Sequence, residues 1–588
     1  MKGKWLFSAL VMLVGAVGFG QKTVPNFVPV TDAQLRNPPA GDWLMYRRTF
    51  DAWGYSPLNQ INTANVSRLR LVWSRAMESG WNEGTPLIRN GVMFLPNNSD
   101  VIQALDARTG DLIWEYRRKV EGRDKFANYL GQIKRGIAIY KDKIYTVTGD
   151  NFVVALDART GKVAWETPRG DVGEVMYASA PIVANGVVVA GSSCQFSGFG
   201  CYATGHDADS GEELWRNYFI PRKGEPGDET WNNTPFESRW MTGAWGHLTY
   251  DPQTDIVYYG STGTGPASPT VRGTLPASGD VVTGGPGSQA GTNTRWAVKP
   301  KTGQVVWRRQ LLPGDSWDQE CTFEMMLINT RLAPAPDAAL AVNPAIRSGE
   351  TRKVLAGVPC KVGTFWNLDA RTGEFIYARN TVVQNMISKI DNRGNVTLNN
   401  DTILKEVGKS YEVCPTFLGG KDWPPAAYFP PLNAIIVPLN NACSTMKPSS
   451  AEPTPRDVYA TELTWKLAPG QTNMGRLEAI SVETGKTLWK FEQKAPNYAA
   501  VLTTAGNLVF TGGQDSRIRA HDARNGRLLW STRLPSTISG HLVTYAVDGK
   551  QYVAVVAGSG LADGILSSAV PEVDFKSGSN AVFVFALD

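Results

Sequence analysis

The sequence predicts an all-β protein that forms a single β-propeller with Trp-docking repeats. A hairpin motif that ends in tryptophan or tyrosine recurs seven times along the 588 residues. Where no insertion intervenes, the copies follow one another at the spacing of about 40 to 50 residues that is typical of propeller blades. The composition agrees with this architecture, because 59 Gly and 36 Pro supply the turns that many short strands require.

The recurring motif reads x-D-x-x-T-G-x-x-x-W, with some replacements. The copies are ALDARTGDLIW (104–114), ALDARTGKVAW (155–165), GHDADSGEELW (205–215), AVKPKTGQVVW (297–307), NLDARTGEFIY (367–377), AISVETGKTLW (479–489) and AHDARNGRLLW (520–530). In each copy, glycine provides the left-handed backbone of the turn, and the next strand delivers an aromatic side chain. We therefore expect each copy to be a β-hairpin stapled by that side chain.

The spacing of the copies separates uninterrupted repeats from repeats with insertions. The third residue of each motif lies at 106, 157, 207, 299, 369, 481 and 522. The wide intervals include 216–296 and 378–478, which are rich in Gly, Pro and Asn. We expect large loops there, on the face where binding sites usually lie. The widest interval has room for one further blade.

The two ends of the chain are predicted to pair with each other. NAVFVFALD (580–588) reads as a strand that stops at the motif's Asp, and LRLVWSRAM (69–77) supplies a strand with a tryptophan. Pairing them closes the ring and removes open sheet edges. One propeller of seven or eight blades then accounts for residues 21–588, without a separate domain.

The first 20 residues are typical of a secretory signal peptide. Lys2 and Lys4 precede an uncharged, mostly apolar run over 5–19, and small residues follow. We expect a periplasmic protein without a membrane span after cleavage, and the alternative is an uncleaved membrane anchor. The net charge of +5 comes without a long basic run, which argues against a nucleic-acid partner.

The six cysteines and four histidines limit which redox and metal sites the sequence can form. No CxxC and no CxxCH motif occurs, so the sequence provides no attachment site for a c-type haem. An even number of cysteines in an exported protein favours disulfides over a metal site.

The repeats, together with WGYSPLNQINTANVSRLRLVW (53–73), resemble the quinoprotein alcohol dehydrogenases over about residues 40–588. Members of this family are eight-bladed propellers that hold pyrroloquinoline quinone (PQQ) over a metal ion. The resemblance implies an eight-bladed, PQQ-dependent dehydrogenase that oxidises an alcohol substrate to an aldehyde or ketone. It also implies that a separate cytochrome c accepts the electrons.

Several segments resemble the family's cofactor-binding text. KRGIAI (134–139) places Arg135 where an arginine pairs with a cofactor carboxylate, and 179–207 places Ser192 and Ser193 on one rim of the quinone. AWGHLTYDP (244–252) places Trp245 beneath the flat cofactor, where a broad aromatic face stacks best. VPCKVGTFW (358–366) places Lys361 beside the quinone oxygens.

Two further segments match less closely. CPTFLGGKDWPP (414–425) places Asp422 where Asn is common and retains Trp423. APNYAAVLTTAG (495–506) places Tyr498 where a Trp lies near the substrate. We expect all three residues to bind the cofactor.

The segment LLPGDSWDQECTFEMM (311–326) resembles the text that contains the catalytic base, and the base falls on Asp318. Glu320 follows two residues later, where the lanthanide-using members carry an extra acid. In an extended backbone the two side chains share a face. We therefore expect Asp318 and Glu320 to bind the metal ion together.

The metal site departs from the family pattern. The family's metal-binding Glu falls on Phe196, and its metal-binding Asn falls on Gly263. Neither side chain offers an oxygen to a hard cation. With Glu320 added, we expect a calcium or lanthanide ion, and a trivalent ion gains more from the extra carboxylate.

We expect the cysteines to pair locally around the site, and the resemblance implies one of the pairs. Cys414 and Cys443 resemble a family disulfide, Cys194 and Cys201 are close enough in sequence to bridge a turn, and Cys321 and Cys360 flank Asp318 and Lys361. The altered metal positions leave a second reading open. It is a non-catalytic propeller of the same fold, used for protein interaction or envelope assembly.

Overall fold

The computed structural model describes residues 22–119, 133–170, 179–193, 201–239, 241–265, 267–269, 279–449 and 461–588. In these ranges strands dominate, and the one α-helix is α1 (Asp32–Arg36). Short 3-10 turns are η1 (Val66–Arg68), η4 (Asp228–Trp231), η5 (Phe236–Ser238), η6 (Pro430–Leu432) and η7 (Ser567–Ala569). None of the described helices is long and apolar enough to cross a membrane. The expected signal peptide, residues 1–20, lies outside the described ranges.

Ten sheets form among the described residues, and eight of them have four or five strands. The first four contain β3 (Leu87–Arg89), β4 (Val92–Asn97), β5 (Val101–Asp106) and β6 (Leu112–Arg117); β7 (Ala138–Tyr140), β8 (Lys143–Val147), β9 (Phe152–Asp157) and β10 (Val163–Pro168); β11 (Ile182–Ala184), β12 (Val187–Ala190), β13 (Tyr202–Asp207) and β14 (Glu213–Tyr218); β15 (Thr249–Asp251), β16 (Ile256–Gly260), β17 (Thr294–Val298) and β18 (Val305–Gln310). Neighbouring strands are antiparallel throughout these sheets.

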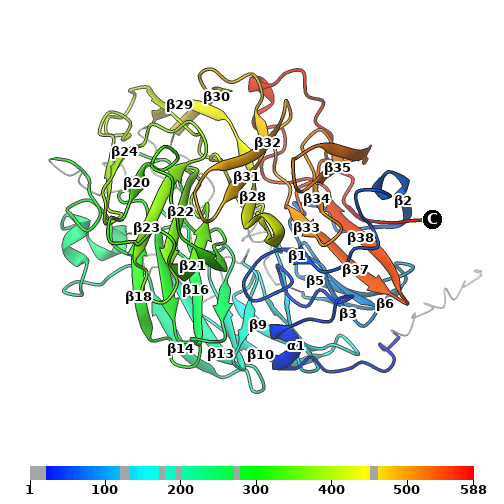
Figure 1. The fold of residues 1–588 in the computed structure, drawn as a ribbon. Coiled ribbons are helices and arrows are strands. Elements are labelled where there is room, and N and C mark those ends of the chain that lie inside the picture. The colour runs from blue at the N-terminus through cyan, green and yellow to red at the C-terminus, as the bar shows by residue number, and fades with distance from the viewer. Residues whose placement is uncertain are drawn as a thin grey trace, which may run out of the picture.

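The remaining large sheets continue the series around the molecule (Figure 1). They contain β19 (Met326–Arg331), β20 (Ala341–Val342), β21 (Thr351–Gly357), β22 (Thr364–Asp369) and β23 (Phe375–Asn380); β27 (Ala427–Phe429), β28 (Ala434–Asn440), β31 (Gly475–Ser481) and β32 (Thr487–Gln493); β1 (Tyr55–Ser56), β33 (Leu502–Thr504), β34 (Leu508–Thr511), β35 (Arg517–Asp522) and β36 (Leu528–Arg533); β2 (Arg70–Ala76), β37 (Leu542–Val547), β38 (Lys550–Ala557) and β39 (Ala581–Ala586).

The predicted pairing of the chain ends is confirmed. Strand β2 pairs with β39 in antiparallel register, with Arg70 opposite Ala586 and Ala76 opposite Ala581. In Figure 1 the blue β2 lies beside the orange and red strands near the C-terminus. One sheet is therefore assembled from both ends of the chain, which leaves no open break between first and last repeat.

In six of the seven motifs the aromatic residue hydrogen-bonds to the turn of the following repeat. A Cβ atom added to Gly161, whose φ is +70°, would lie 2.5 Å from a ring carbon of Trp114. Only glycine gives both this left-handed backbone and the close approach of the ring. The aromatic groups donate hydrogen bonds from Trp114 to Ala158, Trp165 to Ala208, Trp215 to Pro300, Trp307 to Ala370, Tyr377 to Val482 and Trp489 to Ala523.

The segment over 41–54 contacts early strands of many sheets. Its backbone bonds join Gly41 to Ala546, Trp43 to Ile88, Phe50 to Tyr250, Asp51 to Leu327, Trp53 to Tyr428 and Gly54 to Thr503. The Arg47 guanidinium is fully buried and donates to the carbonyl oxygens of Ala426 and Val501. This segment therefore ties sheets together that are far apart in sequence.

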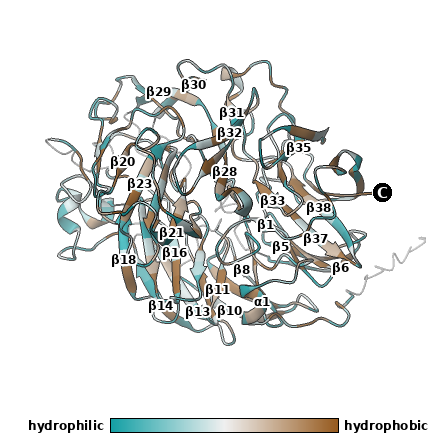
Figure 2. Cartoon of the chain, in the orientation of Figure 1, coloured by the Kyte–Doolittle hydropathy of each residue, from teal (hydrophilic) through white to brown (hydrophobic). Residues whose placement is uncertain are grey.

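Apolar and polar residues both occur along the strands (Figure 2). This pattern follows from the alternation of strand side chains and the packing of sheet against sheet. The two intervals expected to be large loops are not loops throughout. The structure places β15, β16 and part of β17 within 216–296, and β27, β28 and part of β31 within 378–478.

The interval 378–478 also holds two small sheets. One pairs β24 (Ile387–Ile390) with β25 (Val396–Leu398), and the other contains β26 (Tyr411–Val413), β29 (Ala442–Pro448) and β30 (Thr461–Leu467). Apart from the sheet that contains β27 and β28, no four-stranded sheet lies in the described part of this interval. The two small sheets therefore occupy the length of chain that a further blade would need.

Two of the three expected disulfides are present. Cys321 bonds to Cys360, and Cys414 bonds to Cys443. Cys201 is also disulfide-bonded, and its expected partner Cys194 lies outside the described residues.

Candidate active site

The loop that carries the predicted base lies between β18 and β19 and is shaped by Asp315. Its carboxylate accepts backbone N–H bonds from Trp317 and Gln319, at 2.8 and 2.7 Å, and a third bond from the side chain of Asn293. Such side-chain bonds to the following backbone stabilise tight turns. Trp317 anchors the loop, because its buried indole N–H donates a hydrogen bond to the Thr402 carbonyl.

Asp318 has a left-handed backbone, with φ at +73°. The extended backbone over 318–320, which was the condition for the two acids to share a face, is therefore not present at Asp318. The left-handed conformation is uncommon outside glycine, and such strain clusters at functional sites. The carboxylates of Asp318 and Glu320 still lie close together, because both contact the same ammonium group.

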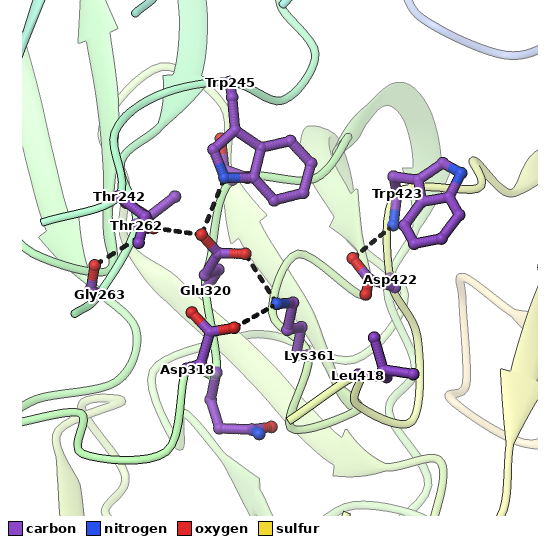
Figure 3. Close-up of polar contacts among 12 residues, drawn as sticks. Thr242, Trp245, Thr262, Gly263, Asp318, Glu320, Lys361, Leu418, Asp422 and Trp423 are labelled. Atoms are coloured by element: carbon purple, nitrogen blue, oxygen red, sulfur yellow. Dashed lines mark hydrogen bonds and ion pairs between the residues drawn. The ribbon is translucent and has the colours of Figure 1, made fainter. Parts of the chain in front are cut away.

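That ammonium belongs to Lys361, in the turn between β21 and β22. Its Nζ lies 2.9 Å from Asp318 Oδ2 and 2.8 Å from Glu320 Oε2, with all three side chains buried (Figure 3). The backbone also joins the two segments, since the Lys361 N–H donates to the Glu320 carbonyl at 3.1 Å. The Cys321–Cys360 disulfide lies directly beside this contact.

A glycine on the facing loop makes room for Lys361. A Cβ added to Gly419, with φ at +73°, would lie 2.5 Å from the Lys361 Cβ. The neighbouring Gly420 N–H donates to the Lys361 carbonyl at 2.7 Å. The lysine is thus held by loops from two different sheets.

Glu320 is the centre of the hydrogen-bond network. Its Oε1 accepts bonds from the Trp245 indole N–H at 2.8 Å and from the Thr242 hydroxyl, while its Oε2 faces Lys361. In Figure 3 the threonines and Gly263 lie on one side of Glu320, and Asp422 and Trp423 lie on the other side of Lys361.

Arg135 and Trp245, both predicted to bind the cofactor, are in contact. The Arg135 guanidinium lies 4.3 Å from the centroid of the Trp245 ring, and its Nη2 lies 2.7 Å from Glu83 Oε2. Glu83 is fully buried, and its burial raises its pKa to about 7, against the lowering effect of Arg135. Sequence reasoning missed Glu83, although an acid just before the apolar strand TPLIR was a usable signal.

The two predicted serines have different surroundings. The Ser192 hydroxyl bonds to both the backbone N–H and the carbonyl of Tyr202, so it holds β13 in place. The Ser193 hydroxyl is buried and has no hydrogen-bond partner among the described residues. Of the two, Ser193 is therefore the one whose hydroxyl fits a ligand. Phe196 lies outside the described residues.

Asp422 and Trp423 lie on the loop that precedes β27. Asp422 is 2% exposed, and its Oδ1 accepts the Trp423 N–H at 2.8 Å, while its Oδ2 has no partner in the described structure. The Trp423 indole stacks on Tyr498 with ring centroids 5.4 Å apart, and the Tyr498 hydroxyl is also buried without a described partner. These orphaned polar atoms suit a polar ligand, because burying them unpaired is costly.

Burial dominates the electrostatics of the site. It raises the pKa of Asp318 well above its usual range; Lys361 opposes this effect and Glu320 adds to it. It raises the pKa of Asp422 to about 6, and Lys361 again opposes the change. A second buried ion pair, between Lys421 Nζ and Glu324 at 3.0 Å, lies beside Asp422 and was not found from sequence.

At Gly263, where the resemblance places an asparagine, a larger side chain has no room. A Cβ at this position would lie 2.1 Å from Asp315 Oδ2, so the carboxylate that shapes the base loop takes the space of the missing side chain. Three or more His, Cys, Asp or Glu side chains do not gather into a metal site in the described part of the chain. The Gly263 carbonyl remains nearby, because Thr242 donates its N–H to it at 3.0 Å.

Comparison with known proteins identifies the family. A model described as glucose/ethanol/alcohol dehydrogenase, β-propeller domain, of the PQQ type, matches residues 43–396 and 446–553. The chain belongs to the PQQ-dependent dehydrogenases. Within this family it is 31% identical over 557 residues to an alcohol dehydrogenase (quinone), dehydrogenase subunit, of Komagataeibacter europaeus, covering 88% of this chain and 72% of the relative.

Other relatives of this family are similar in length and fold. The chain is 31% identical over 544 residues to a lanthanide-dependent methanol dehydrogenase of Methylorubrum extorquens, covering 86% of this chain and 85% of that one. Among solved structures, a europium-containing methanol dehydrogenase has a TM-score of 0.83 and 26% identity, covering 94% and 99% of the two chains. The quinohemoprotein alcohol dehydrogenase of Comamonas testosteroni has a TM-score of 0.79 and 28% identity, covering 94% and 81%.

The site of this PQQ-dependent family member fits its cofactors chemically. A planar, polyanionic quinone suits the Trp245 face, the Arg135 guanidinium and the hydroxyls of Ser193 and Tyr498, which have no partner among the described residues. Calcium and lanthanide ions bind hard oxygen donors, which Asp318 offers together with Glu320. Because those two carboxylates are the only acids that meet at Lys361 in the described site, such an ion also needs main-chain, hydroxyl or cofactor oxygens.

Proposed function

We propose that the protein is a periplasmic PQQ-dependent dehydrogenase that oxidises an alcohol to an aldehyde or ketone. The observation that carries this proposal is the convergence of Asp318, Glu320 and Lys361 beside the Trp245 indole. These residues come from three segments of the chain that are far apart in sequence. A buried acid pair held by one lysine, next to an aromatic platform, is costly for a merely structural core.

The side chains divide the chemistry between them. Asp318 is the base that accepts the hydroxyl proton of the alcohol. When bound, PQQ supplies the acceptor for the two electrons that leave the alcohol carbon with its hydrogen as hydride. Lys361 favours the ionised form of the Asp318 carboxylate that this task needs, since its ammonium opposes the effect of burial on the Asp318 pKa. Trp245 orients the flat cofactor.

The remaining cofactor positions surround this centre. Arg135 pairs with a cofactor carboxylate and is itself oriented by Glu83. The opposite rim of the cofactor site is formed by Ser193, Asp422, Trp423 and Tyr498. Asp318 and Glu320 bind the calcium or lanthanide ion, and the extra carboxylate favours the trivalent ion.

The electrons pass to a separate cytochrome c in the periplasm. The N-terminal pattern of two lysines and an apolar run supports export, and the absence of a CxxCH motif from the sequence calls for an external haem protein. Relatives named quinohemoprotein alcohol dehydrogenase and dehydrogenase subunit support a haem partner.

Each of the eight large sheets is one blade of the propeller. The support is their four or five strands, their order along the chain and the closure of the last sheet by β2. The indoles of the motif dock each blade onto the next, which is supported by their bonds to the following repeat.

Reconstitution tests the function. Purified apoprotein is titrated with PQQ and either calcium or lanthanum, and quinone absorbance and dye-linked alcohol oxidation are recorded. We expect stoichiometric PQQ binding and turnover, with Asp401→Asn as a surface control that behaves as the wild type. A protein that binds no PQQ under either condition is instead the non-catalytic propeller.

A further inference from the structure

A buried ion pair outside the predicted set of site residues joins two segments of the site. Glu324 follows the base loop and lies two residues before β19, and Lys421 lies on the loop that precedes β27. The Lys421 Nζ is 3.0 Å from Glu324 Oε2, and the two side chains are 0% and 1% exposed. A buried ion pair adds little net stability compared with apolar residues of similar volume. What this pair contributes is therefore the position of the groups that it contacts.

Glu324 binds both ends of the loop that precedes β27. Its Oε2 faces the Lys421 ammonium, and its Oε1 accepts the backbone N–H of Ala426 at 2.9 Å. Lys421 also donates to the Asp422 carbonyl oxygen at 3.2 Å. One carboxylate thus closes the loop, and Asp422 and Trp423 lie inside the closed part.

The same ammonium contacts the residue that supports the Trp245 platform. The Lys421 Nζ lies 4.5 Å from the centroid of the Phe323 ring, a cation–π contact. The Phe323 ring meets the Trp245 indole edge-on, with centroids 5.5 Å apart and an interplanar angle of 70°. The Phe323 carbonyl accepts a hydrogen bond from the buried Arg295 guanidinium at 2.6 Å. A shift of the Lys421 ammonium therefore reaches Trp245 through a single ring.

Glu324 is the main counter-charge of Lys421. Burial lowers the pKa of Lys421, and Glu324 opposes this effect, with a smaller contribution from Asp422. If Glu324 is made neutral, Asp422 is the remaining carboxylate that acts on this ammonium, and its Oδ2 has no described partner. The ammonium is then drawn away from Phe323 and towards Asp422.

We propose that Glu324 and Lys421 are positioning residues that hold the Trp245 and Trp423 indoles in the arrangement that fits a planar cofactor. The inference rests on the proposed function, which assigns both indoles to the PQQ site. Neither residue of the pair has to touch the cofactor. The pair raises the affinity for PQQ by preorganisation, because a site that is already ordered loses less conformational freedom on binding.

The test is a double-mutant cycle, measured by PQQ binding to the apoprotein in the presence of calcium. Glu324→Gln keeps an oxygen for the Ala426 N–H but removes the charge, and Lys421→Met keeps an apolar chain beside Phe323. We expect each single variant to bind PQQ at least about 10-fold more weakly, measured by quenching of tryptophan fluorescence, since each leaves a buried charge unpaired. The double variant leaves no unpaired charge, so its loss should be smaller than the product of the two single losses.

A second readout is the circular dichroism that the bound quinone acquires from its orientation against the indoles. At saturating PQQ we expect this spectrum to differ from the wild type in both single variants. Glu406→Gln and Lys409→Met are the matched controls, because the same two substitutions there break an exposed ion pair whose Nζ–Oε1 distance is 2.7 Å. Both controls should bind PQQ as the wild type does.

Thermal unfolding curves separate a loss of stability from a loss of position. Single variants that unfold at a lower temperature but bind PQQ with wild-type affinity and an unchanged spectrum overturn this inference and leave the proposed function intact. If a single variant does not fold, the double variant decides, and wild-type affinity together with a wild-type spectrum there overturns the inference too. A wild-type protein that binds no PQQ overturns both.

Discussion

The raised pKa of Asp422 predicts that an amide at this position changes how stability depends on pH. The carboxyl group is buried, one of its oxygens has no described partner, and its pKa is about 6. An unfolded chain releases the same proton at about pH 3.9. The difference corresponds to about 3 kcal/mol by which folding disfavours the ionised form.

The sign follows from which state holds the proton. Between pH 4 and 6 the folded protein keeps the Asp422 proton while the unfolded chain loses it, so the stabilising contribution is complete below about pH 4 and lost as the pH rises through about 6. Asp422→Asn cannot ionise, and its oxygen still accepts the Trp423 N–H. We therefore expect the variant to gain up to about 3 kcal/mol relative to wild type on going from pH 4 to pH 7.5.

The assay is urea unfolding of the apoprotein at pH 4.5 and pH 7.5, with the difference between variant and wild type taken at each pH. Asp401→Asn, at an exposed position, is the control for the loss of one surface charge. Among the other buried acids with raised pKa values, Asp51 and Asp563 change both proteins alike. The Asp422 charge is one cause of the raised Glu83 pKa, so the Glu83 contribution to the pH dependence is smaller in the variant. If the variant is more stable than the wild type by the same amount at both pH values, or is not more stable at either, the reasoning is refuted.

Two further predictions concern the acid pair, and a third concerns the Cys321–Cys360 disulfide. Lys361→Met leaves the buried carboxylates of Asp318 and Glu320 without their ammonium, so urea unfolding of the apoprotein should show a loss of about 3–5 kcal/mol; a loss below about 1 kcal/mol argues against a shared ion pair. Glu320→Ala should abolish activation by a light lanthanide, whereas activation by calcium alone, untouched by this change, contradicts its role as a metal ligand. Replacing Cys321 and Cys360 together by Ala removes the disulfide that closes a 39-residue loop. The double variant should lose about 4 kcal/mol in the free energy of unfolding, measured in the same assay, and should bind PQQ more weakly. Unchanged stability and affinity would show that the disulfide does not position the site.

The repeated motif carried most of the fold prediction. Its turn glycines and aromatic residues depend on local backbone geometry, which a sequence expresses directly. The pairing of β2 with β39 was also predictable, because an incomplete repeat at each end leaves strands without partners. The strands β27 and β28 inside a Gly- and Pro-rich interval were not, since β27 pairs with β28 and β28 joins the sheet only through contacts with the later strand β31.

Site residues were predictable where a short local motif identifies their role. Asp318, Glu320 and Lys361 each lie in such a motif, and the structure brings them together. The left-handed backbone of Asp318 was missed, because it is imposed by the bonds to Asp315. Glu83 was missed for a similar reason: its pairing with Arg135 spans 52 residues and two sheets.

The most direct test of the central claim is a comparison of wild type and Asp318→Asn, both loaded with PQQ. The amide preserves the shape of the side chain but cannot accept the alcohol proton. The account predicts that the variant binds PQQ with the same stoichiometry, measured by quinone absorbance, and loses at least about 10²-fold in kcat for dye-linked alcohol oxidation. Near-normal kcat with PQQ bound contradicts the assignment of Asp318 as the base.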